Sequence, residues 1–280
     1  MFCKAEYKKF IAFYILKLYN ISLGMENLTK EGYIMNQYKE FASIYDELIN
    51  TDIDYNAWAN KILDICSRFN IEKRDYLDLA CGTGNMTIEL SKHFRSTWAV
   101  DISDQMLTEA ESKLRVFNNK AKFVCQDICN LKLNNKFDLI TCCLDSTNYI
   151  LEDKDLKSYF EGVNSHLKDK GIFIFDINSY YKLTEVLGNN SFNFDSEDVV
   201  YIWDNILEDD IVQMNLTFFV KEGEFYRRFD EEHCERAYKE EYLNNLIENS
   251  GFKIIKRLNN YMDIPIDKDA ERIVYVLGKK

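Results

Sequence analysis

Two glycines one residue apart follow a short apolar run, and an acidic residue lies within that run. The stretch is Tyr-Leu-Asp-Leu-Ala-Cys-Gly-Thr-Gly-Asn over residues 76–85, with Asp78, Gly82 and Gly84 as its chemically informative members. A strand, a tight glycine turn and a helix N-terminus in this order form the ligand-binding corner of a doubly wound α/β sheet. The sequence therefore predicts a small-ligand site here, formed by close approach to the backbone.

The residues around the two glycines indicate which class of ligand fits. A dinucleotide site uses G-x-G-x-x-G to cradle a pyrophosphate, but Thr87 stands at the third glycine position and Ala80 lies two residues before Gly82. The carboxylate of Asp78 would also repel a phosphate and attract a cation. S-adenosylmethionine (SAM) carries a sulfonium and an ammonium group. We therefore expect a SAM site, with a nicotinamide cofactor as the disfavoured alternative.

Two further acidic residues follow the next two apolar runs. Asp101 ends the run 97–100, about twenty residues beyond the glycines, where a carboxylate can bind both hydroxyls of a ribose. Asp127 follows the run 122–126. Either carboxylate could instead cap the end of its strand. Their joint spacing from the glycine turn favours a place in the same site.

The run Asp-Leu-Ala-Cys-Gly-Thr-Gly over residues 78–84 resembles the first motif of the class I SAM-dependent methyltransferases, D-x-A-C-G-T-G. The resemblance extends from about Tyr38 to the C-terminus, with further motifs in the same order. Within that class the chain is similar to small-molecule N-methyltransferases, such as glycine N-methyltransferase and the sugar-amine dimethyltransferases, and to uncharacterised clostridial members. It implies a SAM cofactor and a small-molecule acceptor.

The resemblance also implies roles for particular residues. The acidic position of Asp127 receives the adenine amino group in the family, and the backbone amide of Ile128 meets the ring. Tyr45 and Trp58 would cover the methionine end of the cofactor, since aromatic faces attract a sulfonium, or both would simply pack the helices to the sheet. The other residues implied in cofactor binding are Ala80, Cys81, Ile102 and Cys143.

The segment after the apolar run 137–143 is the place where class I methyltransferases bring residues to both the methyl group and its acceptor. Here it is Leu-Asp-Ser-Thr-Asn-Tyr over residues 144–149, without the Asn/Asp-Pro-Pro-Tyr/Phe of DNA amino-methyltransferases or the Pro-Cys of cytosine-C5 enzymes. Asp145, Tyr149 and, further along the chain, His233 are the candidates for orienting or deprotonating the acceptor. A lone histidine on a strand can equally be structural.

The order of elements predicts an α/β fold with a doubly wound, seven-stranded, mostly parallel sheet. After the buried strand 171–175 the pattern changes, and residues 179–238 predict an antiparallel β insertion with strands 199–206, 211–221 and 224–237. Two last strands, 253–258 and 272–277, complete the large sheet. An insertion at this point would roof the acceptor pocket, because ligands bind at the carboxyl ends of the strands.

Residues 1–34 do not fit this plan. Lys30-Glu31-Gly32 can be encoded as AAG-GAG-GGN, a bacterial ribosome-binding sequence just before the codon of Met35. We therefore expect residues 1–34 to be an extension outside the native protein and residues 35–280 to form the methyltransferase domain. The alternative is an ordinary N-terminal helix.

Composition narrows the possible partners. The formal charge of −12 disfavours nucleic acid, which requires clustered Lys and Arg, and the apolar run 10–16 is too short to cross a membrane. The eight cysteines fall inside predicted strands and helices, so reduced thiols in a cytoplasmic protein are expected, with no metal. Cys142 and Cys143 are adjacent in a strand, point to opposite faces and cannot share a metal tetrahedrally.

These observations predict methyl transfer from SAM to a small-molecule acceptor by in-line displacement. An amine is favoured, because a neutral amine attacks directly and needs only to lose a proton. Two alternatives stay open at the level of the sequence. One is O-methylation of a small hydroxyl compound, and the other is a SAM-binding sensor or partner protein without catalysis.

Overall fold

The computed structural model describes residues 53–117 and 120–280. The proposed extension 1–34 and Tyr45 lie outside these residues. The elements run along the chain as follows: α3 Tyr55–Arg68, β1 Asp75–Leu79, α4 Asn85–Ser91, β2 Ser96–Asp101, α5 Asp104–Val116, β3 Lys122–Cys125, η2 Ile128–Asn130, β4 Phe137–Cys142, η3 Ser146–Tyr149, α6 Asp153–His166, β5 Leu167–Asn178, η4 Lys182–Leu187, β6 Ser191–Asp195, β7 Val199–Glu208, β8 Ile211–Glu222, β9 Phe225–Arg236, α7 Glu240–Asn249, β10 Phe252–Asn259 and β11 Arg272–Lys279.

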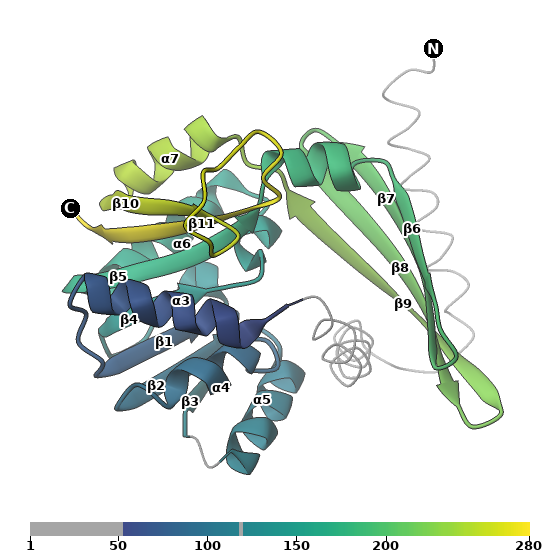
Figure 1. The fold of residues 1–280 in the computed structure, drawn as a ribbon, viewed down its shortest axis with the longest axis horizontal. Helices are drawn as coiled ribbons and strands as arrows, with labels where there is room; N and C mark the ends of the chain where they lie inside the picture. The colour runs from purple at the N-terminus through teal and green to yellow at the C-terminus, as the bar shows by residue number, and fades with distance from the viewer. Residues whose placement is uncertain (1–52, 118–119) are drawn as a thin grey trace. The chain divides into compact units, whose positions relative to one another are not determined.

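Seven strands form the large sheet in the order β10-β11-β5-β4-β1-β2-β3 (Figure 1). The pairs among β1 to β5 are parallel, and β11 pairs antiparallel with both β5 and β10. The chain thus reverses its strand order beside β1, and such a switch point opens a crevice at the carboxyl ends of the strands. The predicted seven-stranded, mostly parallel sheet is confirmed.

The large sheet is buried on both faces, because alternate residues of its strands point to opposite sides. Phe173 and Phe175 of β5 pack in the cluster that contains α6 and α7. Ile172 and Ile174 pack on the other side, in the cluster that contains α3 and α4. Figure 1 shows α3 in front of the sheet and α6 behind it. This two-sided burial explains why these strands have near-continuous apolar sequences.

The antiparallel insertion after β5 is confirmed as a second sheet of four strands in the order β6-β7-β8-β9. Asp209 and Asp210 both have positive φ (50° and 64°) and close the two-residue hairpin between β7 and β8. Gly223, with φ +64°, lies in the turn before β9. β6 was not among the three predicted strands, because its five residues are mostly exposed and lack a continuous apolar run.

Within the described ranges, no helix has the length and apolarity that crossing a membrane requires.

Candidate functional site

The turn between β1 and α4 has the backbone conformation that its glycines allow. Gly82 has φ +53° and Gly84 has φ +81°, in the left-handed region that other residues rarely adopt. A Cβ atom on Gly84 would lie 2.9 Å from the Cβ of Ala110, so this glycine also lets α4 and α5 pack closely. A Cβ atom on Gly82 would meet nothing within 4 Å. Gly82 therefore borders open space at the carboxyl end of β1.

Asp78 is the buried carboxylate of this corner, with 1% of its surface exposed. Its two oxygens accept hydrogen bonds from the hydroxyls of Thr87, at 2.5 Å, and Thr141, at 2.8 Å. Burial raises the pKa of Asp78 to about 6, and these hydrogen bonds oppose the rise. Asp78 thus joins α4 and β4 to β1 while its charge faces the site.

Asp101 ends β2 with its carboxylate held beside the glycine turn. Its oxygens accept the backbone N–H groups of Gly82 at 2.8 Å and Ser103 at 2.9 Å. Burial raises the pKa of Asp101, and these hydrogen bonds oppose the rise. The neighbouring Ile102 is 71% exposed, which is unusual for a large apolar side chain next to a buried carboxylate. An exposed apolar side chain beside a fixed carboxylate suits a ligand with a flat ring and a sugar.

The third acidic residue is less enclosed. Asp127 is exposed and accepts the backbone N–H of Cys129 at 2.8 Å, which caps the short turn η2. Ile128 is half-buried and packs against the core. The backbone N–H of Gln126 donates to the carbonyl of Asp101 at 2.9 Å, so the carboxyl ends of β2 and β3 are joined directly before Asp127.

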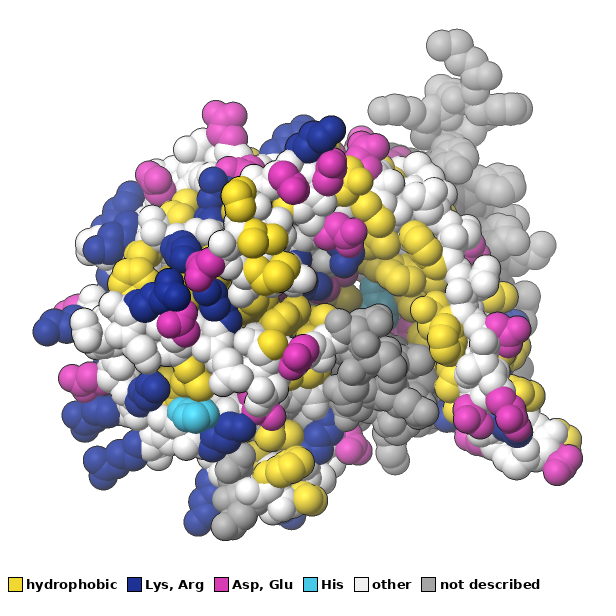
Figure 2. Space-filling model, in the orientation of Figure 1, with side chains coloured by type: hydrophobic (Ala, Val, Ile, Leu, Met, Phe, Trp, Pro, Cys, Tyr) yellow, Lys and Arg dark blue, Asp and Glu magenta, His cyan; other side chains and the backbone are white. Residues whose placement is uncertain are grey.

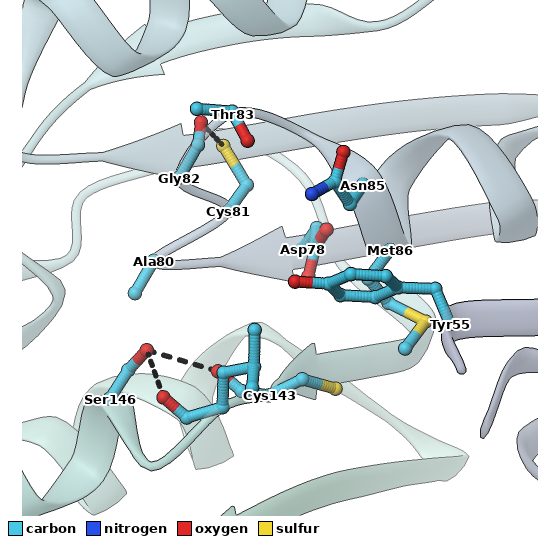
Figure 3. Close-up of a pocket in the computed structure, with 11 residues that line it drawn as sticks. Tyr55, Asp78, Ala80, Cys81, Gly82, Thr83, Asn85, Met86, Cys143 and Ser146 are labelled. Carbon is cyan, nitrogen blue, oxygen red and sulfur yellow. Dashed lines mark hydrogen bonds between the residues drawn. The ribbon is translucent and has the colours of Figure 1, made fainter. Parts of the chain in front are cut away.

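One pocket opens at the carboxyl ends of β1 and β4 (Figure 3). Its lining consists of Tyr55, Asp78, Ala80, Cys81, Gly82, Thr83, Asn85, Met86, Cys143, Leu144 and Ser146. Five of these residues were predicted for cofactor binding: Asp78, Ala80, Cys81, Gly82 and Cys143. Gly84, Asp101, Ile102, Asp127 and Ile128 are not in this lining, and their roles stay predictions.

Trp58 and Cys143 meet the same buried tyrosine. The ring of Trp58 stacks on that of Tyr261 with centroids 4.3 Å apart, and only 7% of Trp58 is exposed. The hydroxyl of Tyr261 lies 3.3 Å from the sulfur of Cys143. Burial raises the pKa of Cys143 well above its usual value, so its thiol stays protonated. The position of Trp58 favours packing over contact with a cofactor, while Cys143 lines the pocket.

The three candidates for acceptor chemistry come from two segments far apart in the chain: Asp145 and Tyr149 from the segment around η3, and His233 from β9. The rings of Tyr149 and His233 meet edge to face, with centroids 5.9 Å apart and an interplanar angle of 88°. The side-chain amide of Asn148 donates to the carbonyl of Arg236 at 2.9 Å, which ties η3 to the end of β9. Strand β9 therefore packs against the segment that follows β4.

Burial governs the ionisation of the groups on β9. It lowers the pKa of His233, and the charge of Asp145 opposes this shift. Glu235 lies two residues further, on the same face of the strand, and is 3% exposed. It accepts a hydrogen bond from the side-chain amide of Asn178 at 2.8 Å. Burial, followed by the charge of Asp145, raises the pKa of Glu235 well above its usual value.

Comparison with known proteins identifies the family. Residues 77–171 match the family model described as a methyltransferase domain. YqeM of Bacillus subtilis strain 168, a protein named as a methyltransferase, is 32% identical over 245 residues, which cover 86% of this chain and 97% of YqeM. The crystal structure of a SAM-dependent methyltransferase from Clostridium acetobutylicum ATCC 824 is 54% identical, with a TM-score of 0.83 over 86% of this chain and 98% of that chain. The chain belongs to the SAM-dependent methyltransferases.

The predicted family and its SAM cofactor are thereby confirmed. The sugar N-methyltransferase KedS8 from Streptoalloteichus sp. ATCC 53650 is 21% identical, with a TM-score of 0.69 over 84% of this chain and 93% of that chain. This likeness shows a shared fold.

The residues of this methyltransferase fit SAM. The open space in front of Gly82 admits the close approach of a ligand to the backbone. The carboxylate of Asp101 keeps lone pairs for ribose hydroxyls besides those that accept Gly82 and Ser103, and the carboxylate of Asp78 faces the pocket with a charge that suits a cation.

Sequence reasoning missed two residues of this region. Tyr55 lines the pocket from the first turn of α3, three residues before Trp58, and Figure 3 shows its ring beside Asp78 and Met86. A rule that prefers the aromatic residue with the more polar neighbours in the sequence could have identified Tyr55. Arg272, at the start of β11, forms an ion pair with Asp145 at 2.7 Å, although the two residues are 127 positions apart in the sequence. No local signal marks that contact.

Proposed function

We propose that this methyltransferase transfers the methyl group of SAM to the nitrogen of a small amine that binds between η3 and β9. The observation that carries this proposal is the face of β9 with Glu231, His233 and Glu235, where two buried carboxyl groups flank a histidine next to the ring of Tyr149. Alternate residues of a strand point to one side, so all three belong to one surface.

The charges of this surface favour a cationic acceptor. Arg272 is paired with Asp176 and with Asp145, so that cation is already balanced by carboxylates. Glu231 and Glu235 add acidic groups, in a chain with a net charge of −12. The pKa of Glu235 is raised well above its usual value, and a bound ammonium would favour the ionised form of this carboxyl. An anionic acceptor would not favour the ionised carboxyl in this way.

The rest of this face is apolar, and part of it is already packed, since Met214 is buried in a cluster with Leu183 and Leu187 of η4. Met214 and Leu216 lie directly opposite His233 and Glu231 in the β8–β9 pair and so share their face. Trp203 of β7 continues this face opposite Leu216. Figure 2 shows hydrophobic side chains gathered along the inner side of the four-stranded sheet. An amine carried on a small ring or chain would match this combination of acid and apolar groups.

His233 is suited to accept the proton that the amine must lose before it attacks. Its pKa is lowered by burial, so the imidazole is neutral near pH 7 and one ring nitrogen can act as a base. Asp145 would orient the ammonium form of the acceptor by accepting a hydrogen bond, and the edge-to-face contact with Tyr149 fixes the plane of the imidazole. When bound, SAM supplies an electrophilic methyl group on a positively charged sulfur.

The sugar N-methyltransferase KedS8 supports this proposal through its shared fold, which includes most of both chains. A hydroxyl acceptor is the main rival, because His233 could deprotonate a hydroxyl as well as an ammonium. The acidic face of β9 favours the amine, since a neutral hydroxyl compound would not benefit from it.

The test is incubation of the purified protein with methyl-labelled SAM and a fractionated metabolite extract, followed by mass spectrometry. We expect label in a product that retains a basic nitrogen and binds to a cation-exchange resin. A labelled ether or ester would overturn N-methylation while leaving methyl transfer in place. Tight SAM binding without consumption in any fraction would favour the SAM-binding sensor.

A further inference from the structure

A second feature of the site is a strained turn between β4 and η3. Leu144 and Asp145 both have positive φ, 58° and 49°, although neither is glycine. Side chains beyond Cα disfavour this conformation, and two such residues in succession need support from their surroundings. Leu144 lines the cofactor pocket, and Asp145 begins the segment that carries Tyr149. The turn therefore connects the two halves of the site.

The support is a buried carboxylate. Asp176, near the end of β5, is fully buried and accepts the backbone N–H of Leu144 and of Asp145, each at 2.9 Å and each on a different oxygen. The hydroxyl of Tyr261 donates to the same carboxylate at 2.6 Å. One side chain thus binds both amides of the turn and fixes its backbone.

An arginine completes this arrangement. The guanidinium of Arg272 bonds to Asp176 and, through its other terminal nitrogen, to the carboxylate of Asp145 at 2.7 Å. It is 8% exposed and lies over the ring of Trp58, 5.3 Å from the ring centre. Arg272 therefore fixes the side chain of the same residue whose backbone Asp176 fixes.

We infer that Asp176 and Arg272 are positioning residues that hold the Leu144–Asp145 turn, and with it the carboxylate of Asp145, in place for the acceptor. Neither Asp176 nor Arg272 lines the cofactor pocket. Their effect on the acceptor rests on the proposed function, whereas their effect on the turn does not. The two parts can therefore fail separately.

The perturbation is Arg272→Lys, because lysine keeps the charge but presents a single nitrogen and cannot bridge two carboxylates in the same fork geometry. We expect the amides of residues 144 and 145 to exchange with solvent about tenfold faster, with little change in β1. For the acceptor identified with labelled SAM, we expect kcat/KM to fall by about a hundredfold, while the SAM dissociation constant changes by less than about tenfold.

The matched control is Lys168→Gln. Lys168 also bridges two carboxylates, those of Asp75 at 2.6 Å and Asp138 at 2.9 Å, but at the opposite, amino-terminal ends of β1 and β4. It should lower the melting temperature without changing exchange at the turn or the kinetic constants. If both variants alter exchange and kinetics alike, the effect of Arg272 is general stability and the inference is wrong.

A second variant separates positioning from direct contact with the acceptor. Glycine adopts φ +58° without strain, so Leu144→Gly should make the turn depend less on its contacts with Asp176 and Arg272. We expect Arg272→Lys to lower kcat/KM by a smaller factor in the Leu144→Gly background than in the natural chain. An equal factor in both backgrounds would show that Arg272 acts on the acceptor itself. Faster amide exchange at the turn without an effect on turnover would show that Asp176 and Arg272 hold the turn but do not position Asp145 for the acceptor.

Discussion

The carboxylate of Asp101 offers the sharpest test of the cofactor site. The change is Asp101→Ala, which removes a side chain that is 8% exposed and fixed by two backbone amides. If each ribose hydroxyl donates one hydrogen bond to this carboxylate, the substitution should cost about 2–3 kcal/mol of SAM binding free energy. This figure allows for water that replaces one of the two contacts. That free energy corresponds to a SAM dissociation constant raised by about 30- to 150-fold.

Stability should respond less than affinity. The amides of Gly82 and Ser103 lose their acceptor, which costs about 1–2 kcal/mol if water does not replace it fully. Calorimetric titration with SAM and urea denaturation of the same preparation measure the two effects. The control is Asp104→Ala, which removes the same charge from the exposed first turn of α5.

A folded Asp101→Ala protein that binds SAM as tightly as the natural chain would exclude Asp101 from the site. An equal loss in Asp104→Ala would show that the effect is long-range charge and not a contact with the ribose.

Three further predictions concern the carboxylate of β1 and the histidine of β9. Thr87→Val should destabilise the fold by about 1–3 kcal/mol in urea denaturation, because an oxygen of Asp78 loses its partner inside the core; an unchanged midpoint would contradict that role. The pKa of Asp78 in the folded protein is about 6, above its ordinary value of 3.8, so the folded state binds the proton more tightly than the unfolded state. The contribution of Asp78 to stability should therefore fall as pH rises from about 4 to 6. Asp78→Asn should flatten that part of the stability curve, and a curve of unchanged slope would refute the shift. His233→Gln should lower turnover, while the SAM dissociation constant changes by less than about tenfold. Because burial lowers the pKa of His233, the natural enzyme should lose activity only at a pH below the ordinary histidine pKa. Cys234→Ala, on the opposite face of β9, should keep full turnover.

The cofactor half of the site was predictable because its signals are local. Asp78, Gly82 and Gly84 belong to one strand-turn-helix unit, and each glycine has a positive φ that glycine adopts without strain. Asp101 lies in the next strand, and parallel strands bring their carboxyl ends together whatever the side chains are. Spacing along the sequence was therefore sufficient to place these residues at one edge.

The other half depends on contacts that sequence spacing does not encode. Arg272 and Asp176 are 96 residues apart, and only the antiparallel pairing of β11 with β5 brings them together. Trp58 shows the same limit in a different way. An aromatic residue on α3 could have lined the pocket or packed on the sheet, and the stacking of Trp58 on Tyr261 favours packing.

The arrangement of charges suggests how one fold separates cofactor from acceptor. Asp78 and Asp101 lie at the ends of β1 and β2, and among the described residues their hydrogen-bond partners are hydroxyls and backbone amides. The carboxylates at the ends of β4 and β5, Asp145 and Asp176, are instead paired with Arg272. In the proposed site the first pair would offer its charge to a positively charged cofactor. In the second pair the charges are balanced by Arg272, and Asp176 holds the strained turn that carries Asp145. If the acceptor is the proposed amine, its cation is attracted mainly by the buried carboxyl groups of β9. The proposal therefore predicts that the antiparallel sheet, and not the large sheet, determines which acceptor is methylated.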